Sequence, residues 1–350
     1  MRRFNSFLAV VLGITGSPLS AQTSGGWGDE LSGVIEAPEG LLQLATPGAD
    51  GLDWPAAPVM SPPREIKAIY LNAWVFGTRR FYDLVRLVQG TEINAFVIDV
   101  KDDTGYLTYA SQVPTAIQIG ANQQRRAPDT RARLAYLRAH GIYPIARIVV
   151  AKDPLLAEKK PQWSVHNQRG GPWRDRLNFA WVDAYNDSIW VYAAQLGEEA
   201  VRQGFEELQF DYVRFPDEPR ARLASAVFPA RRARESSRAA ITRNLRLLRD
   251  RVRDLGVPFT VDVFGLTTSA EDDLGIGQVW EDLVATADVV LPMVYPSHYS
   301  HGYYNISHPN SEPYRTIRRA MEDALRRSAP LSTSAQIRPY LQAFTLGRPR

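Results

Sequence analysis

Cysteine is absent from all 350 residues of the sequence, and this absence excludes several kinds of site together. A chain without thiols forms no disulfide, no thiolate metal site and no cysteine nucleophile, and it cannot be lipidated at an N-terminal cysteine. Its stability must therefore come from packing alone. Lysine is also scarce, because only five of the 41 basic residues are lysine, so arginine is the common surface cation.

Long hydrophobic runs are missing too, since no stretch reaches the ~20 apolar residues that a membrane-spanning helix requires. The apolar run at 7–14 follows Arg2 and Arg3 and precedes small residues around 17–21. This layout is typical of a secretory signal. We expect residues 1–22 to be a signal peptide and the protein to be exported, periplasmic or extracellular, with no transmembrane segment. A short N-terminal anchor or a disordered tail is the alternative.

A large excess of either charge is absent as well. The formal net charge is +3, and it falls to +1 once residues 1–22, with two arginines and no acid, are removed. The arginines between residues 220 and 253 are interspersed with Asp and Glu, a pattern typical of a solvated surface. We therefore expect no nucleic-acid partner.

Two regions follow the signal-like segment. Residues 23–65 are rich in Gly, Pro, Ala and Ser, which predicts a linker or an extended strap. From residue 66 to residue 350, β-prone runs alternate with helical patterns, which predicts an α/β domain with a parallel sheet. The expected strands are Ala68–Trp74, Ala95–Lys101, Tyr143–Val150, Glu207–Phe215, Phe259–Gly265, Asp288–Tyr295 and Ile337–Phe344. The expected helices are Arg79–Gln89, Asp129–His140, Val182–Gln203, Arg231–Leu255 and Pro313–Arg327.

The connections in this domain favour a TIM (β/α)8-type barrel. Gly141, Gly204 and Gly256 each separate a helix from a strand, as expected for a glycine that ends a helix in the left-handed conformation. The first strand is followed by NAWVFG and not by a glycine-rich phosphate loop, which disfavours a nucleotide-binding sheet and any cofactor. Because only seven strands can be counted, we expect a C-terminally incomplete barrel that lacks its last strand. An open edge covered by the N-terminal segment is the alternative.

Polar side chains are expected at the carboxyl ends of these strands. Residues two apart share one face of a strand, so the inward-facing set can be followed along each run. The strongest motif is QFDYVRFP at 209–216, where Asp211 ends a β-prone run, and Asp262 in VDVFG follows one strand later. Two carboxylates are what most glycosidases require, so Asp211 and Asp262 are the predicted catalytic residues. The predicted substrate-binding residues are Asn72, Asp99, Lys101, Arg147, Arg214, Tyr295 and Gln342.

Several alternatives stay open for these residues. The charged ones could form buried salt bridges, such as Asp99 with Arg147 or Asp211 with Lys101, and Arg214 could alternate to the other face and pair with helix carboxylates. Asp102 and Asp103 are more typical of a turn. Aromatic residues expected to offer flat faces to sugar rings are Trp74, Trp173, Trp181, Tyr295, Tyr299 and Tyr303. The histidines at 298, 301 and 308 match no metal-binding spacing, so no metal is expected.

The strand motifs together resemble a known bacterial family. The matching segments are YLNAW at 70–74, NAFVIDVKDDTG at 94–105, PIARIVVAKDP at 144–154, QFDYVRFP at 209–216, VDVFG at 261–265, VLPMVYPSHY at 290–299 and IRPYLQAF at 337–344. They resemble, in order, a glycosyl hydrolase domain that was formerly a domain of unknown function. The resemblance implies a barrel akin to the alpha-amylase and alpha-galactosidase-like superfamily, a catalytic aspartate at Asp211 with Asp262 as its matching partner, and a final strand that this chain lacks.

We therefore expect an exported glycoside hydrolase that acts on a polysaccharide or oligosaccharide. A non-catalytic polysaccharide-binding barrel and a metal-dependent polysaccharide deacetylase are the alternatives.

Overall fold

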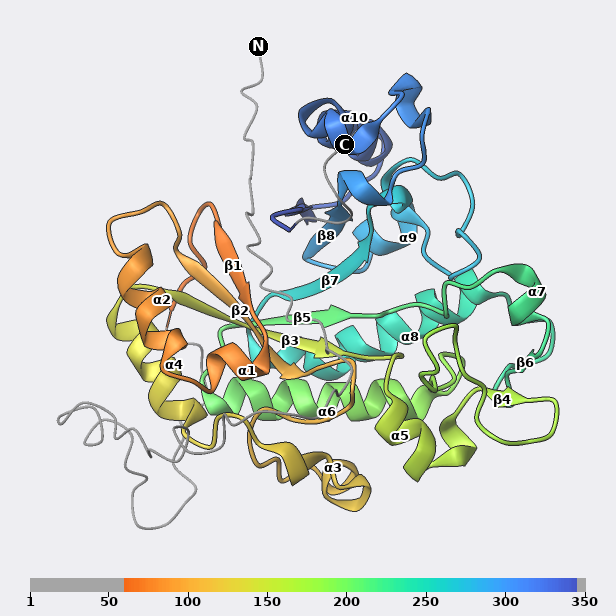
Figure 1. Ribbon diagram of the computed structural model, residues 1–350, viewed down its shortest axis with the longest axis horizontal. Coiled ribbons are helices and arrows are strands. Elements are labelled where there is room, and N and C mark those ends of the chain that lie inside the picture. Colours follow the sequence, from red (N-terminus) through yellow and green to blue (C-terminus); the bar gives the residue numbers. More distant parts are fainter. Residues whose placement is uncertain (1–59, 345–350) are drawn as a thin grey trace, which may run out of the picture.

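The computed structural model describes residues 60–344, and a single parallel sheet organises them (Figure 1). The predicted signal peptide and most of the predicted linker lie outside the described residues. The strands are β1 Ala68–Leu71, β2 Ala95–Lys101, β3 Tyr143–Val149, β4 His166–Asn167, β5 Glu207–Asp211, β6 Ala226–Val227, β7 Phe259–Phe264, β8 Val289–Val294, β9 Gln336–Ile337 and β10 Tyr340–Leu341. The helices are α1 Ala73–Phe76, α2 Arg80–Val88, α3 Pro114–Ile119, α4 Thr130–Ala139, α5 Pro154–Lys159, α6 Asp187–Gln203, α7 Arg220–Leu223, α8 Ser237–Val252, α9 Trp280–Val284 and α10 Pro313–Ser328.

The sheet has the strand order β1-β2-β3-β5-β7-β8-β10, and β9 also pairs with β8. All of these pairs are parallel, and β9 and β10 together occupy the seventh position. Such pairs need crossover connections, which the helices between the strands supply. Figure 1 shows α6 and α8 running side by side along one face of the sheet. The short pair β4–β6 is antiparallel and lies in the loops outside this sheet.

The sheet is strongly curved, because side chains of strands that are not neighbours meet on its inner face. Gln209 of β5 donates a hydrogen bond to the Tyr340 hydroxyl of β10, although β7 and β8 lie between these strands. Below them, Glu207 of β5 and Arg338 form a buried ion pair of 2.7 Å. This curvature is that of a barrel in which seven strand positions are filled. Within residues 60–344 no strand bridges β1 and β10.

The helical face of the sheet carries the main hydrophobic core. α6 begins at Asn186, whose side chain caps Ser188 N–H, and it ends at Gly204, which has a φ of 110°. Gly197 of this helix lies directly over β5, since a Cβ there would be 3.0 Å from a methyl carbon of Leu208. This close approach fixes β5, and with it the end of the strand at Asp211, against the longest helix.

The inner face of the sheet is layered. At the amino ends of β1, β2 and β3 it is apolar, with a cluster that includes Ala95, Val97, Tyr143 and Ile145. One layer higher, towards the carboxyl ends, charged and hydroxyl-bearing side chains replace the apolar ones. The apolar cluster and the buried Glu207–Arg338 pair fill the interior at the amino ends, so the polar side chains with open space beside them lie at the carboxyl ends of the strands. Within the described residues no helix is long and apolar enough to cross a membrane.

Candidate active site

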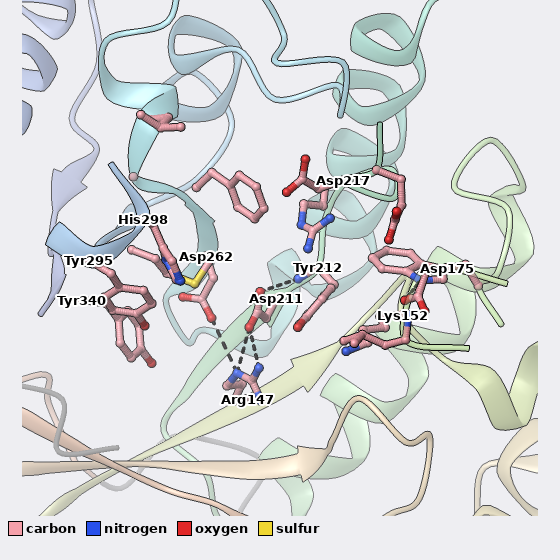
Figure 2. A pocket seen from close by; sticks show the side chains of 18 of the residues that line it. Arg147, Lys152, Asp175, Asp211, Tyr212, Asp217, Asp262, Tyr295, His298 and Tyr340 are labelled. Carbon is pink, nitrogen blue, oxygen red and sulfur yellow. Dashed lines mark hydrogen bonds and ion pairs between the residues drawn. The ribbon is translucent and has the colours of Figure 1, made fainter. Parts of the chain in front are cut away.

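A cavity of about 620 Å³ lies at the carboxyl ends of the central strands (Figure 2). Five of the predicted site residues line it: Arg147, Asp211, Arg214, Asp262 and Tyr295. The volume lies within the range usual for small-molecule sites. Figure 2 shows Arg147 at the base of the cavity with Asp211 and Asp262 beside each other above it, and Tyr295 and Tyr340 along one wall.

Arg147 of β3 connects three carboxylates. Its Nη1 is 2.5 Å from Asp99 Oδ1 on β2, and its Nη2 is 2.5 Å from Asp211 Oδ2 on β5. Its Nε is 3.0 Å from the same oxygen of Asp211 and 3.8 Å from Asp262 Oδ2 on β7. Burial alone would lower the pKa of the guanidinium, but the attraction of Asp99 and Asp211 outweighs burial and raises this pKa well above its usual value. Arg147 is therefore a permanent cation between these acids.

Asp262 has the environment of a carboxylic acid that keeps its proton. It is almost completely buried, and its Oδ2 accepts a hydrogen bond of 2.9 Å from Gln209 while its Oδ1 has no partner within the described residues. Burial and the neighbouring charge of Asp211 raise the pKa of Asp262 well above its usual value, although Arg147 opposes the shift. Asp262 is therefore suited to donate a proton.

Asp211 has the opposite environment. Its Oδ2 accepts two charge-assisted hydrogen bonds from Arg147, and its Oδ1 accepts the backbone N–H of Tyr212 at 2.5 Å. Donors of this kind fix the orientation of the carboxylate. The site thus holds one carboxyl group paired closely with the Arg147 guanidinium and one that burial keeps protonated, an arrangement that suits a nucleophile beside an acid.

Asp99 forms an ion pair with Arg147 and is not among the residues that line the cavity. It lies directly opposite Arg147 in the register of β2 and β3, and the Tyr70 hydroxyl donates to its Oδ2 at 2.5 Å. Burial raises the pKa of Asp99 to about 6, although Arg147 and the Tyr70 hydrogen bond hold it down. The Asp99–Arg147 pair is the salt bridge that the sequence left open as an alternative to substrate binding.

Lys101 lies on the opposite face of β2 from Asp99, although strict alternation placed both on the inner face. A bulge between the two residues pairs Asp99 with Arg147 and Lys101 with Ile148, a residue of the core under the helices. Lys101 therefore points away from the cavity and forms a buried ion pair of 2.5 Å with Asp153, not with Asp211. A bulge inserts one extra residue and so reverses the faces that follow it.

Asn72 and Gln342 also lie outside the set that lines the cavity. Asn72 follows β1 and caps α1, with its Oδ1 accepting the Val75 N–H at 2.9 Å. Gln342 accepts the Ser297 N–H at 3.1 Å and donates to the Phe344 carbonyl at 3.0 Å, so it joins two loops. The expected strands 68–74 and 337–344 are shorter in the structure, and both residues follow the last residue of a strand. The alternation of a strand therefore does not decide where their side chains point.

Arg214 lies on the cavity side, contrary to the alternation that would have turned it towards helix carboxylates. β5 ends at Asp211, and Tyr212 has a φ of 53°, in the left-handed region. This turn breaks the two-residue period, so the expected strand 207–215 stops at its functional residue and Arg214 turns back into the cavity.

Sequence reasoning missed several residues of the site. Tyr70 and Tyr340 lie two positions before Asn72 and Gln342, so the same alternation could have found them. The other loop residues carried no such signal; those that line the cavity are Lys152, Asp175, Arg176, Leu177, Tyr212, Asp217, Glu218, Leu266 and Phe344. Of the expected aromatic residues, Trp181, Tyr295 and Tyr299 line the cavity, whereas Trp74 is 61% exposed under the guanidinium of Arg126.

The histidines do not assemble a metal site with neighbouring acids. His298 lines the cavity, while the rings of His301 and His308 contact each other at 4.8 Å. Within residues 60–344 no group of three or more histidine, aspartate or glutamate side chains is arranged to hold a metal ion.

Comparison with known proteins places this geometry in a family. A sequence model of the family described as "Putative glycosyl hydrolase domain" matches residues 68–349. The chain belongs to this family. The match begins with β1 and includes every strand of the sheet, so the glycosyl hydrolase domain is the barrel that carries the cavity. It confirms the resemblance of the strand motifs, and the parallel sheet confirms the expected barrel type.

Solved structures are similar to this glycosyl hydrolase domain to different extents. A hypothetical protein from Ruminiclostridium thermocellum ATCC 27405 is 34% identical with a TM-score of 0.50, over 59% of this chain and 98% of that one. An alpha-galactosidase from Thermus thermophilus is 16% identical, with a TM-score of 0.43, over 70% of this chain and 45% of its own. An exo beta-N-acetylglucosaminidase from Vibrio harveyi is 14% identical, with a TM-score of 0.47, over 67% and 42%. A search of curated proteins gave no significant match.

Proposed function

We propose that the protein is a glycoside hydrolase that cleaves an oligosaccharide or polysaccharide with Asp211 as the nucleophile and Asp262 as the general acid and base. The observation that carries this proposal is the shared guanidinium of Arg147, which lies within 4 Å of both carboxylates at the base of an open cavity. Burial keeps Asp262 protonated beside the Asp211 carboxylate, and glycoside cleavage requires such an acid next to a second carboxyl group.

In the first step Asp211 attacks the anomeric carbon while Asp262 gives its proton to the departing glycosidic oxygen. The bond from the anomeric carbon to that oxygen breaks, and a covalent glycosyl ester on Asp211 forms. Esterification removes the negative charge of Asp211, which is one of the two causes that keep the pKa of Asp262 high. Asp262, now ionised, takes a proton from water as the water attacks the ester, and both carboxyl groups return to their initial states.

The walls of the cavity fit a carbohydrate. The rings of Tyr295, Tyr340, Phe264 and Trp181 present flat apolar faces on which the C–H faces of sugars can stack. Polar groups such as Lys152 and His298 also line the cavity and can bind hydroxyl groups. From the signal-like pattern of residues 1–22 we further propose that the enzyme is exported and meets its substrate in the periplasm or outside the cell.

Activity on defined glycans tests the proposal. The protein is incubated with a panel of bacterial and plant polysaccharides, and new reducing ends are measured for the wild type and for Asp211→Ala, Asp262→Asn and Asp83→Asn. Asp83 lies on the exposed surface of α2 and pairs with Arg86, so its variant is the matched control and should keep full activity. We expect Asp262→Asn to lose about 10²–10⁴-fold in kcat, the usual contribution of an acid catalyst.

Chemical rescue separates the two roles. Azide should restore turnover to Asp211→Ala as a glycosyl azide, because a small anion can take the place of the missing nucleophile. Full activity of both Asp211→Ala and Asp262→Asn on a cleaved glycan would refute the assignment. Glycan binding that survives in every variant, without product at any enzyme concentration, would instead identify a non-catalytic binding barrel.

A further inference from the structure

Arg214 is a buried cation that has no anionic partner in the described part of the chain, and it lines the same cavity as Asp211 and Asp262. Only 8% of its surface is exposed, yet no carboxylate oxygen of residues 60–344 lies within 4 Å of its nitrogens. The other buried arginines of the barrel interior differ in this respect, since Arg147 and Arg338 are each held by carboxylates at 2.7 Å or less.

The contacts of Arg214 leave most of its donors unused. Within the described residues its single hydrogen bond runs from Nη1 to the Phe215 carbonyl at 2.9 Å, whereas a guanidinium has five N–H groups. None of its nitrogens is sealed in the protein without a partner, so the remaining N–H groups face the open space of the cavity.

Three aromatic rings hold the guanidinium in place. Its central carbon lies 4.4 Å from the ring centre of Phe264, 4.8 Å from that of Tyr212 and 5.2 Å from that of Trp181. Rings attract a cation through their faces and add no negative charge, so they orient the guanidinium without neutralising it. Burying an uncompensated charge is costly for folding, and the cost is offset once an anion binds.

The carboxylates nearby are committed to other partners or exposed. Asp175 accepts the Trp181 indole N–H at 2.9 Å, and Glu218 lies 3.4 Å from Arg222. Asp217 is exposed at the cavity rim and forms no ion pair within residues 60–344, although its charge and that of Asp211 act on Arg214. Asp217 is therefore an exposed carboxylate of the described rim that can compete with a ligand for Arg214.

We infer that Arg214 binds an anionic group of the substrate, so that the cavity accepts a sugar carrying an oxyanion next to the bond that is cleaved. Arg214 follows Asp211 by three residues in the same segment, which places this subsite beside the proposed nucleophile. A planar guanidinium matches a carboxylate with two parallel hydrogen bonds, so a uronic acid is the substrate class that fits best. This inference rests on the proposed function in assigning the anion to a cleaved sugar.

Binding of single sugars tests the subsite without any need for turnover. Affinities for glucuronate, its uncharged methyl ester, glucose and glucose 6-sulfate are measured by calorimetry at constant ionic strength, and the fluorescence of Trp181 next to Arg214 offers a second readout. We expect glucuronate to bind at least about tenfold more tightly than the ester and glucose, because a charge-assisted hydrogen bond contributes at least the free energy of a tenfold change in Kd. Tighter binding of glucose 6-sulfate than of glucuronate would identify a sulfated sugar as the source of the anion.

Variants connect the preference to Arg214. Arg214→Gln should bind acid and ester equally, Arg214→Lys should keep part of the preference, and Asp217→Asn should strengthen glucuronate binding by removing the competing charge. The melting temperature of Arg214→Gln should not fall, because the variant removes an unpaired buried charge. Equal affinity of the wild type for glucuronate and its ester, the absence of binding by either, or a preference that survives in Arg214→Gln would overturn the inference.

The two proposals fail separately. Cleavage of a neutral glycan that depends on Asp211 but not on Arg214 would leave the hydrolase standing and remove the anion subsite. Conversely, glucuronate binding that depends on Arg214, together with no cleavage of any acidic or neutral glycan, would keep the subsite and remove the hydrolase.

Discussion

Arg147 holds Asp211 through two nitrogens on one oxygen, with Nε at 3.0 Å and Nη2 at 2.5 Å from Oδ2. The two residues lie on neighbouring strands, and Arg147 pairs in register with Gln209, two positions before Asp211. The guanidinium therefore reaches diagonally towards the carboxyl end of β5. This geometry fixes the orientation of the carboxylate and brings the third acid, Asp262, into contact with the same side chain.

Replacing Arg147 by Met should destabilise the fold strongly. The change leaves Asp99, Asp211 and Asp262 without their shared cation, and breaking a buried pair in this way costs about 3–5 kcal/mol. Denaturant unfolding at neutral pH measures the loss. Arg318→Met is the control, because the Arg318–Glu322 pair is exposed and such pairs contribute little to stability. An Arg147→Met midpoint equal to that of the control would contradict the central role of this guanidinium.

The products of hydrolysis should keep the anomeric configuration of the substrate. Both carboxylates lie within 4 Å of Arg147 Nε, so they are close together, and retaining glycosidases hold their pair at about 5–5.5 Å, closer than inverting ones. Proton NMR of the first product, recorded before mutarotation, distinguishes the anomers. An inverted product would mean that water attacks directly and that Asp211 acts as a base.

Activity should fall as the pH rises through the pKa of Asp262. Burial and Asp211 raise this pKa, so the folded enzyme keeps the proton of Asp262 at pH values where an exposed aspartate has lost it. The acid is therefore present below the raised pKa and is lost above it. A profile of kcat/KM against pH should show a declining alkaline limb, and Asp262→Asn should flatten that limb in its residual activity. A rate that climbs steadily with pH would be incompatible with Asp262 as the acid.

Lys101 should contribute to the stability of the fold and not to substrate binding. Its ion pair with Asp153 is completely buried, so Lys101→Met should cost about 3–5 kcal/mol, and Lys101→Met with Asp153→Asn should cost much less than the sum of the single changes. Asparagine at 153 keeps an oxygen for the Leu156 N–H and so preserves the start of α5. Unfolding measurements on the four proteins test this. A raised KM with unchanged stability would instead support the substrate-binding role expected from the sequence.

Much of the fold follows from local patterns in the sequence. β2 spans Ala95–Lys101 as predicted, and the other main strands begin within one residue of their expected positions. Short β-prone runs bounded by turn residues define where a strand begins. The helix-ending glycines Gly141, Gly204 and Gly256 all have positive φ, as expected. The alternation of the strands also predicted that Arg147, Asp211 and Asp262 face the same interior, and all three line one cavity.

The departures of Lys101 and Arg214 from the expected alternation share one physical cause. The two-residue period of a strand holds only while the backbone stays regular, and a bulge or a left-handed residue reverses it. The bulge after Asp99 turned Lys101 to the helical face, and Tyr212 turned Arg214 into the cavity. Neither irregularity has a clear sequence signal, because neither position is a glycine.

The sequence by itself determined the order of strands and helices, the family and the acids at the strand ends, since these depend on local propensity and on short motifs. Only the tertiary structure decided which acid pairs with Arg147, which acid keeps its proton and which buried cation has no anionic partner among residues 60–344. Those properties depend on burial and on neighbours that are far apart in the chain, such as Arg147 and Asp262, and the curvature of the sheet brings them together.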